Sequence, residues 1–399
     1  MTAVERGPRK ERKAASRGRH PASRVAPDGR GPRRPVGRRT GPFLIIFLAT
    51  AALVLLGVVM TLSASAVVSI NTSDSAWSLF RRQLMWTGFG TVALFAAMRF
   101  DYRRLRVLAL PAAVGSAVLL VVVLIPGVGV DVNGATRWIR VGPLSFQPSE
   151  IAKLGLVLFA ADILSRPSRD MKNTAVTFRP VVAVTAFFIG LLMLQPHLGN
   201  ALIMAVAVCT MLFIAGAPLV NLAAVGLVGA LGTAMTVIGT SWRRQRFRVF
   251  LDPWVDPEGL GYQPLQALHA ITVGGLTGVG LGASKAKWGF LPFAHSDFIF
   301  AIIAEELGLL GAAFVVLAFV IFAGAGFVAA LRAPDRFGLL LALGITTWIV
   351  AQAFLNIGSV INIVPVVGVT LPFLSFGGTS LVVTMAAVGV LLNVARQGR

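Results

Sequence analysis

Long apolar segments alternate with short polar segments along nearly all of this 399-residue chain. A helix needs about 20 apolar residues to cross the hydrocarbon core of a bilayer. We predict ten membrane-spanning helices, at residues 43–66, 83–97, 105–125, 151–164, 181–194, 198–217, 219–239, 298–331, 337–358 and 371–394. The fourth and fifth segments are short, which is typical of tilted or kinked helices.

The composition leads to the same fold class. Hydrophobic residues make up 56% of the chain and charged residues only 13%, and the mean hydropathy is +0.80. A soluble protein of this length could not bury so much apolar surface. We therefore predict an all-α polytopic membrane protein with about ten transmembrane helices.

The first 42 residues differ from the rest of the chain because they are polar and strongly basic. They contain 13 of the 36 Lys and Arg residues but only 3 of the 16 acidic residues. This composition, rich in Arg, Pro and Gly, predicts a disordered tail. A basic tail can bind nucleic acid, but before a first membrane helix it more often marks the cytoplasmic side and contacts anionic lipid. We favour the second interpretation and expect membrane lipid, and no nucleic acid, as its partner.

Four further basic segments fall on the same side of the membrane as the tail: 101–106, 166–172, 332–336 and 396–399. Since positively charged loops stay in the cytoplasm, we expect both termini there, with 397–399 as a short cytoplasmic end. The outer side then carries two loops, 127–149 and 240–297, and the second is too long for a simple connection. Its apolar stretch 270–282 can fold back toward the membrane only against protein or water.

Asp297 is the most informative residue of the second loop because it directly precedes the apolar segment 298–331. An ionisable residue beside hydrocarbon is costly to place, so it is a candidate for chemistry. The competing interpretation is a helix cap, in which the carboxylate accepts hydrogen bonds from free amides at the helix start. Glu305 follows eight residues later, near the same helix face, and needs a basic partner if it is buried.

Basic residues of the second loop are candidates for binding phosphate oxygens. Arg243 and Arg246 belong to a basic cluster at 242–248, and Lys285 and Lys287 lie closer to Asp297 along the chain. Guanidinium groups match the geometry of phosphate oxygens. Contact with lipid headgroups explains the cluster equally well.

Polar residues inside or next to the apolar segments give further candidates. Glu150 and Lys153 are three residues apart and can pair on one helix face, and a structural salt bridge is favoured over contact with a substrate. Trp138, between two arginines, is either an interfacial anchor or a substrate contact. In the ninth segment, Gln352 and Asn356 are spaced for hydrogen bonding within the bundle.

Three separated motifs resemble the SEDS family of shape, elongation, division and sporulation proteins. They are Gly134-Ala-Thr-Arg-Trp-Ile with Phe146-Gln-Pro-Ser-Glu-Ile-Ala-Lys153, then Leu291-Pro-Phe-Ala-His-Ser-Asp-Phe-Ile-Phe-Ala-Ile-Ile-Ala-Glu-Glu-Leu-Gly308, and last Asn356-Ile-Gly358 with Leu371-Pro-Phe-Leu-Ser-Phe-Gly-Gly-Thr-Ser380. The resemblance covers about residues 43–396. The stretch Gly280-Leu-Gly-Ala-Ser-Lys-Ala-Lys-Trp-Gly289 is more similar to FtsW, the division member, than to RodA, the elongation member.

The resemblance implies a peptidoglycan glycosyltransferase with ten spans, which polymerises lipid II on the outer face and releases undecaprenyl diphosphate. It implies that Asp297 is the catalytic base and that Trp138, Glu150 and Lys153 are functionally important. It also implies two kinds of partner: a class B penicillin-binding protein, which is a transpeptidase, and the FtsZ-organised divisome at the septal cell membrane. A divalent cation, Mg²⁺ or Mn²⁺, could assist the diphosphate, but the sequence assigns no ligands to it.

Three positions depart from the family pattern. Phe293 stands where Glu is frequent, His197 where Asp is usual and Phe376 where Tyr is common. A metal or diphosphate site that used carboxylates at positions 293 and 197 would lack those ligands in this chain.

General chemistry agrees with the implied activity. A sugar hydroxyl that attacks an anomeric carbon needs a base, and the leaving diphosphate needs positive charge. We expect a single displacement with inversion, which gives a β-1,4 link. Two rival functions are a lipid II flippase and a scaffold without chemistry of its own, and an elongation role is the alternative to division. Clustering of the charges on one side favours surface chemistry over alternating access.

Overall fold

The computed structural model describes residues 2–3, 41–73, 77–132, 135–142, 144–166 and 176–398. The chain divides into two units, Met1–Pro35 and Val36–Arg399, and the description below concerns the second. The predicted tail, apart from residues 2–3 and 41–42, lies outside the described residues, as do most of the predicted basic loop 166–172 and the terminal Arg399. Those predictions therefore stay predictions.

A helix forms at each of the ten predicted positions. The helices are α1 Gly41–Ser73, α2 Ser78–Arg99, α3 Leu105–Val122, α4 Pro148–Ser165, α5 Phe178–Leu194, α6 Leu198–Ile214, α7 Leu219–Gly239, α10 Ile299–Leu331, α11 Arg336–Val360 and α12 Thr379–Gln397. In the described part of the chain, six helical stretches are long and apolar enough to cross a membrane, and α5 and α6 are shorter apolar helices. The polytopic helical fold predicted from the apolar pattern is confirmed.

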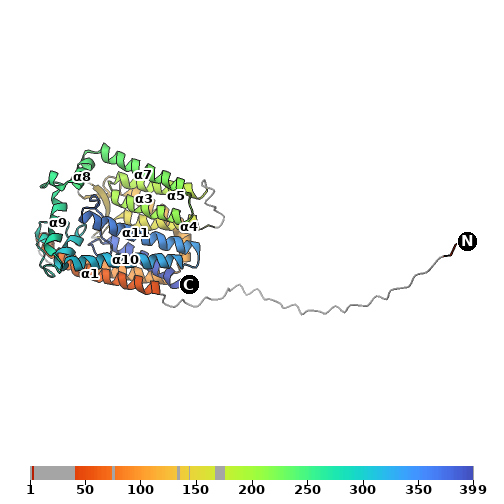
Figure 1. The fold of residues 1–399 in the computed structure, drawn as a ribbon, viewed down its shortest axis with the longest axis horizontal. Coiled ribbons are helices and arrows are strands. Elements are labelled where there is room, and N and C mark those ends of the chain that lie inside the picture. The colour runs from red at the N-terminus through yellow and green to blue at the C-terminus, as the bar shows by residue number, and fades with distance from the viewer. Residues whose placement is uncertain are drawn as a thin grey trace. The chain divides into compact units, whose positions relative to one another are not determined.

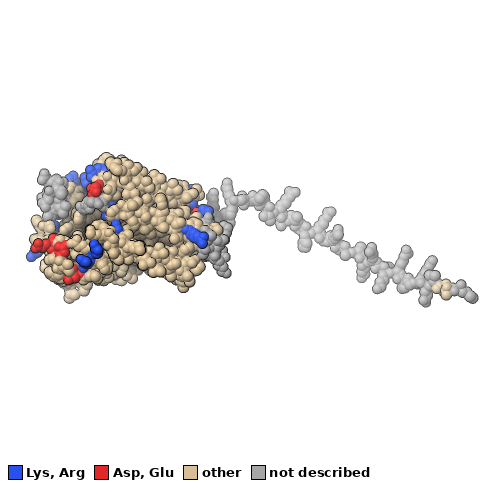
Figure 2. Space-filling view, turned by 90° about the horizontal axis from the view of Figure 1, so that it is seen from above, with Lys and Arg blue, Asp and Glu red and all other residues tan. Residues whose placement is uncertain are grey.

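The helices lie side by side with roughly parallel axes, and the segments that connect α7 to α10 lie at the end of the bundle away from the C-terminus (Figure 1). Figure 2 shows that, on the face it presents, the charged side chains lie mostly toward the two ends of the bundle, with uncharged surface between them. Such a belt is expected where a protein meets hydrocarbon, because charged side chains there are costly.

Both long loops contain regular structure that the sequence pattern did not predict. The first loop forms an antiparallel sheet of order β1-β2-β3, with strands Gly129–Val132, Ala135–Val141 and Leu144–Phe146. Trp138 on β2 is opposite Val130 on β1. The second loop contains α8 Ser241–Leu251, η2 Pro253–Val255, α9 Tyr262–Gly274 and η3 Ala286–Trp288.

The last predicted helix begins later than expected. Helix α12 starts at Thr379, not at residue 371, and residues 361–378 form a non-helical connection, called here the 361–378 segment. Pro372 and the Gly377-Gly378 pair disfavour a helix here. The second part of the segment is nevertheless inside the protein, since Leu371, Phe373 and Leu374 are at most 2% exposed. Non-helical backbone at such depth is tolerated only where protein surrounds it.

Helix α10 is interrupted at Gly308, whose φ of 68° and ψ of −166° are not helical. Residues 275–280, which follow α9, lie against the break and satisfy the backbone groups that it frees. Four hydrogen bonds do so: Val279 N to Glu305 O, Gly280 N to Glu306 O, Leu309 N to Gly275 O and Leu310 N to Leu276 O. The apolar stretch 270–282 therefore does fold back against protein, as the demand for backbone pairing requires.

Glycine is required at Gly308 for two reasons. Its φ is positive, which side chains with a Cβ rarely adopt. In addition, a Cβ there would clash with the backbone of Gly278 and Leu276. The break and the folded-back stretch thus depend on each other.

We predict that Gly308→Ala destabilises the protein by about 1–3 kcal/mol, because a strained backbone conformation has a cost of that order. Gly324→Ala, in the same helix but with open space around its Cβ position, is the matched control and should be neutral or slightly stabilising. Thermal unfolding of the two purified variants in the same detergent compares them. Equal melting temperatures of the Gly308→Ala and Gly324→Ala variants would contradict the requirement for glycine at position 308.

Candidate functional site

Asp297 lies in the last turn of the second loop, two residues before α10 begins at Ile299. The residue that caps this helix is Phe298, and no side chain makes a cap hydrogen bond there. The capping interpretation of Asp297 is therefore wrong. The carboxylate is partly buried and accepts no hydrogen bond from the described residues, and a Cβ at Gly368 would lie 3.8 Å from its Oδ2.

The backbone around Asp297 is held firmly although its carboxylate is free. Three consecutive carbonyls accept hydrogen bonds: His295 O from Phe376 N at 3.0 Å, Ser296 O from Ser375 Oγ at 2.6 Å and Asp297 O from Asn356 Nδ2 at 2.7 Å. Asn356 Nδ2 also donates to Val369 O at 2.7 Å. Helix α11 and the 361–378 segment together fix where the carboxylate lies. The predicted bonding of Asn356 within the bundle is confirmed.

Arg137 is the charged neighbour of Asp297. It extends from β2 and donates Nε to Gln195 O at 3.0 Å and Nη2 to Pro196 O. Burial raises the pKa of Asp297 to about 6, and the positive charge of Arg137 partly opposes that rise. Burial and the nearby charge of Arg246 lower the pKa of Arg137, while Asp297 raises it. One carboxylate and two guanidinium groups thus share one electrostatic environment.

Arg137 was not among the site residues predicted from the sequence, although it directly precedes Trp138 in the motif Gly134-Ala-Thr-Arg-Trp-Ile. The pairing of β1 with β2 shifts between Val130 and Asp131, so Arg137 lies between the paired residues Thr136 and Trp138 as the extra residue of a β-bulge. A bulge interrupts the alternation of side chains between the two faces of a sheet. A strand pattern alone would therefore not have shown which side chain is directed toward Asp297. No contact in the described residues brings Trp138 to Asp297.

Helix α8 carries the two predicted arginines. Arg246 is half-buried, and its Nη1 donates to Val366 O at 3.3 Å. Its guanidinium also lies 5.4 Å from the Trp242 ring centre, and that of Arg243 lies 5.3 Å from the same ring. Burial lowers the pKa of Arg246. The structure therefore places Arg246 at the site, whereas Arg243 stacks on Trp242.

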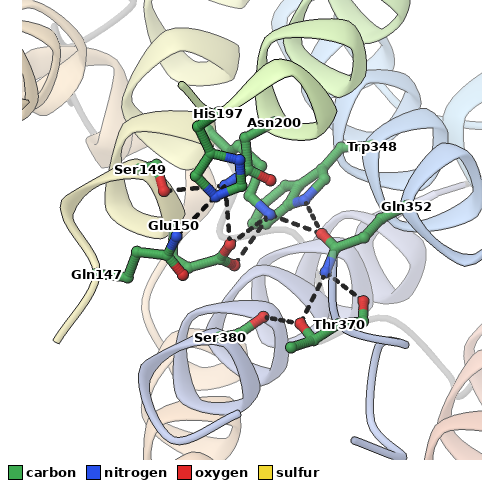
Figure 3. Close-up of polar contacts among 10 residues, drawn as sticks. Gln147, Ser149, Glu150, His197, Asn200, Trp348, Gln352, Thr370 and Ser380 are labelled. Carbon is green, nitrogen blue, oxygen red and sulfur yellow. Dashed lines mark hydrogen bonds and ion pairs between the residues drawn. The ribbon is translucent and has the colours of Figure 1, made fainter. Parts of the chain in front are cut away.

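Glu150 and Lys153 form a fully buried ion pair, with 2.9 Å between Lys153 Nζ and Glu150 Oε2 (Figure 3). Lys153 Nζ also donates to Gln352 Oε1 at 2.6 Å and lies 5.1 Å from the Trp348 ring centre. Gln352 Nε2 in turn donates to Thr370 O at 2.9 Å. The ion pair is therefore linked through Gln352 to the 361–378 segment. It lies inside the bundle, where it can hold that segment in position.

A second branch of this network contains His197, where the family usually has Asp. Asn200 Nδ2 donates to Glu150 Oε1 at 3.2 Å, and His197 Nε2 lies 2.7 Å from Gln147 Nε2 (Figure 3). Burial, together with the charges of Arg137 and Lys153, lowers the pKa of His197 to about 3. A neutral imidazole therefore fills this position. Phe293, another of the three departures, is 48% exposed.

The two predicted lysines lie apart from Asp297 in the described contacts. Lys287 is buried and its Nζ donates to Glu306 Oε1 at 3.0 Å, Ser63 Oγ at 3.0 Å and Gly282 O at 2.6 Å. These three bonds use all the donors of an ammonium group. The side chain of Lys285 is exposed. Lys287 therefore has a structural role, whereas the side chain of Lys285 is exposed at the surface.

Glu305 does not have the basic partner that was expected for it. Its carboxylate accepts hydrogen bonds from Ser284 Oγ at 2.5 Å, Lys285 N at 2.9 Å and Ala286 N at 3.4 Å. Several such donors can hold a buried carboxylate without a cation. The prediction was wrong for Glu305, and it is the neighbouring Glu306 that pairs with Lys287.

The residues around Asp297 do not fit a metal ion held by the protein. Across the described ranges, no group of three or more His, Cys, Asp or Glu side chains could hold one. Asp297 is a lone carboxylate beside a guanidinium, whereas Mg²⁺ and similar cations prefer several oxygen ligands. The divalent cation stays a prediction, and no step below depends on it.

Comparison with known proteins identifies the family. A sequence model of FtsW, RodA and SpoVE proteins, described as a cell cycle protein, matches residues 43–399. The chain belongs to the FtsW/RodA/SpoVE family. Stage V sporulation protein E of Bacillus subtilis is 40% identical over 362 residues, which cover 91% of this chain and 99% of that protein. The probable peptidoglycan glycosyltransferase FtsW of Geobacter metallireducens is 39% identical over 88% of this chain and 94% of its own length.

Solved structures confirm the fold of this family member. One, from work on structural coordination of polymerization and crosslinking by a peptidoglycan synthase complex, has a TM-score of 0.71 and 33% identity, covering 88% of this chain and 96% of its own. The rod shape determining protein RodA of Thermus thermophilus has a TM-score of 0.65 and 31% identity, covering 88% and 95%. The resemblance to SEDS proteins is confirmed, and the names of several relatives agree with the enzyme class it implies.

We predict that Lys153→Met destabilises the protein by about 3–5 kcal/mol, because it leaves Glu150 charged and buried without its ion-pair partner. Combining it with Glu150→Gln should recover most of the loss. Arg103→Gln is the control, since Arg103 and Asp335 form a partly exposed pair and such pairs contribute at most about 1 kcal/mol. Thermal unfolding compares the single variant, the double variant and the control. A Lys153→Met variant as stable as wild type would disprove that Lys153 stabilises the buried charge of Glu150.

Proposed function

We propose that this protein polymerises lipid II into glycan strands on the outer face of the cell membrane, with undecaprenyl diphosphate as the leaving group. The observation that carries the proposal is the partly buried Asp297 carboxylate, which accepts no hydrogen bond from the described residues and has Arg137 as its charged neighbour. Arg246 in turn acts on Arg137 through its charge. Relatives named peptidoglycan glycosyltransferase support the reaction class.

Asp297 acts as general base in this mechanism. It removes a proton from the acceptor hydroxyl as that oxygen attacks the anomeric carbon of the donor, and the bond from that carbon to the diphosphate oxygen breaks. The guanidinium groups of Arg137 and Arg246 stabilise the negative charge that develops on the diphosphate. The reaction is a single displacement with inversion and gives a β-1,4 link. A product of retained configuration would contradict it.

The other candidate residues have supporting roles in this proposal. Glu150 and Lys153 hold the 361–378 segment through Gln352, and Lys287 holds the second loop on α10 through Glu306. Arg243, Lys285 and Trp138 are left for contact with lipid headgroups or with the outer parts of the substrate.

The cellular setting belongs to the same proposal. Both termini are cytoplasmic, and the protein works at the division septum with a class B penicillin-binding protein and the FtsZ-organised divisome. The similar solved structure of a peptidoglycan synthase complex that coordinates polymerization and crosslinking supports a transpeptidase partner. Relatives with FtsW, RodA and sporulation names share this fold, so an elongation role is the alternative.

A lipid II flippase or a scaffold without activity fits the site less well. Alternating access builds its binding site near the membrane midplane between repeated units. Here the candidate charges come from β2, α8 and the start of α10, and α8 lies toward one end of the bundle (Figure 1). A scaffold, for its part, has no need for a carboxylate kept basic by burial.

We predict that Asp297→Asn lowers the polymerisation rate by about 10²–10⁴-fold, the usual contribution of a general base. The assay is lipid II polymerisation by purified protein with its cognate transpeptidase, read as glycan strand length. Glu258→Gln, which neutralises an exposed carboxylate of the same loop, should leave the rate unchanged. Equal polymer from wild type and Asp297→Asn would remove Asp297 as the base.

The raised pKa of Asp297 predicts a pH dependence. A base acts in its deprotonated form, so kcat/KM should fall about tenfold per unit as pH drops below about 6. Since Arg137 lowers the pKa of Asp297, Arg137→Gln should shift this limb to higher pH in addition to slowing the reaction. A wild-type profile without an acid limb between pH 5 and 7 would refute the assignment.

A further inference from the structure

A cavity of about 200 Å³ is lined in part by α8, and Arg246 is the one of its lining residues that the mechanism described so far uses. Its walls come from α8, α9 and the 361–378 segment. Its lining includes Arg246, Phe250, Tyr262, Gln263, Asn362 and Val366.

The polar groups of this cavity are only partly used by the protein. Gln263 Nε2 donates to Pro292 O at 3.1 Å and Asn362 Nδ2 donates to Phe250 O at 3.2 Å. Each amide keeps an accessible oxygen, and neither that oxygen nor the Tyr262 hydroxyl has a hydrogen-bond partner among the described residues. Arg246 makes one weak carbonyl bond, which leaves most of its donors available.

The cavity is close to Asp297. Val366 is two residues from Gly368, and two residues of chain span at most about 7 Å. A Cβ at Gly368 would lie 3.8 Å from Asp297 Oδ2. Pro292, on another wall, is five residues before Asp297 in the same loop. The cavity wall at Val366 is therefore at most about 12 Å from the candidate base.

The size and the lining together indicate the class of ligand. Pockets for drug-sized molecules run from about 300 to 1,000 Å³, so this cavity accommodates one ring-sized group. Amide oxygens, a phenol and apolar walls suit a sugar ring, which has both hydroxyls and apolar faces. A guanidinium adds preference for an anionic oxygen.

We infer that this cavity is a subsite for one saccharide unit that carries an anionic group, with Arg246 meeting the charge. The inference rests on the proposed function. The anion is either the diphosphate or a carboxylate of the attached peptide, and the experiment separates these two sources.

Binding is tested without turnover by thiol labelling. Cys209 is the sole cysteine of the chain, so Cys209→Ala gives a background in which Leu260→Cys places a thiol in the cavity wall. Val255→Cys, exposed and outside the lining, is the matched control. A lipid-free muramyl disaccharide pentapeptide should slow maleimide labelling of the Leu260→Cys variant at least about threefold and leave the control unchanged.

Two further compounds identify the anion. Protection by inorganic pyrophosphate assigns the diphosphate, and protection by the disaccharide pentapeptide but not by pyrophosphate assigns the peptide carboxylate. An uncharged disaccharide should protect less, at the same concentration, than the anionic compound that protects. Absence of protection by every compound would overturn the subsite.

Kinetics supply an independent measurement. Tyr262→Phe removes a hydroxyl from the cavity, and Leu260→Trp fills part of its volume. Each variant should raise KM for lipid II about tenfold with a smaller change in kcat. Val255→Trp should change neither. Unchanged KM in both cavity variants, with normal polymerisation by wild type, contradicts the subsite alone, whereas no polymerisation by folded wild type contradicts the proposed function.

Discussion

One amide group joins the two chain segments on which the candidate site depends. Asn356 Nδ2, in a side chain with no exposed surface, donates to Asp297 O and to Val369 O at 2.7 Å each. Inside a protein that excludes water, a carbonyl without a donor costs about 1–3 kcal/mol. Both segments are therefore tied to α11, and the position of the Asp297 carboxylate follows from that attachment.

The need to pair buried polar groups by hydrogen bonds also accounts for the other irregular segments of the backbone. The break at Gly308 occurs where residues 275–280 supply two amides and two carbonyls, and Glu305 is buried where Ser284 and two amides reach it. Each departure from helix is thus matched by a second segment distant in sequence. A membrane bundle can contain a loop-built site only when such pairing is available.

The sequence predicted the parts of this structure that depend on local pattern. Apolar runs located ten of the twelve α-helices of the described residues, and the spacing of Glu150 and Lys153 predicted their ion pair. The strands were missed because three to seven residues carry little periodic signal. The late start of α12 and the partner of Glu305 were missed because both depend on tertiary contacts. Arg137 comes near Asp297 only when the first loop is folded into a sheet.

The arrangement of charge is compatible with the proposal that one site holds both a base and a binding site for an anion. If Arg137 paired directly with Asp297, the carboxylate would lose basicity and the guanidinium would lose its donors. Instead Arg137 is anchored on the carbonyls of Gln195 and Pro196, near enough to act through its field but without a salt bridge to Asp297 in the described structure. Burial can then raise the pKa of the carboxylate while the positive charge stays available. In the proposed mechanism, these fixed carbonyl anchors keep the base and the anion-binding group apart.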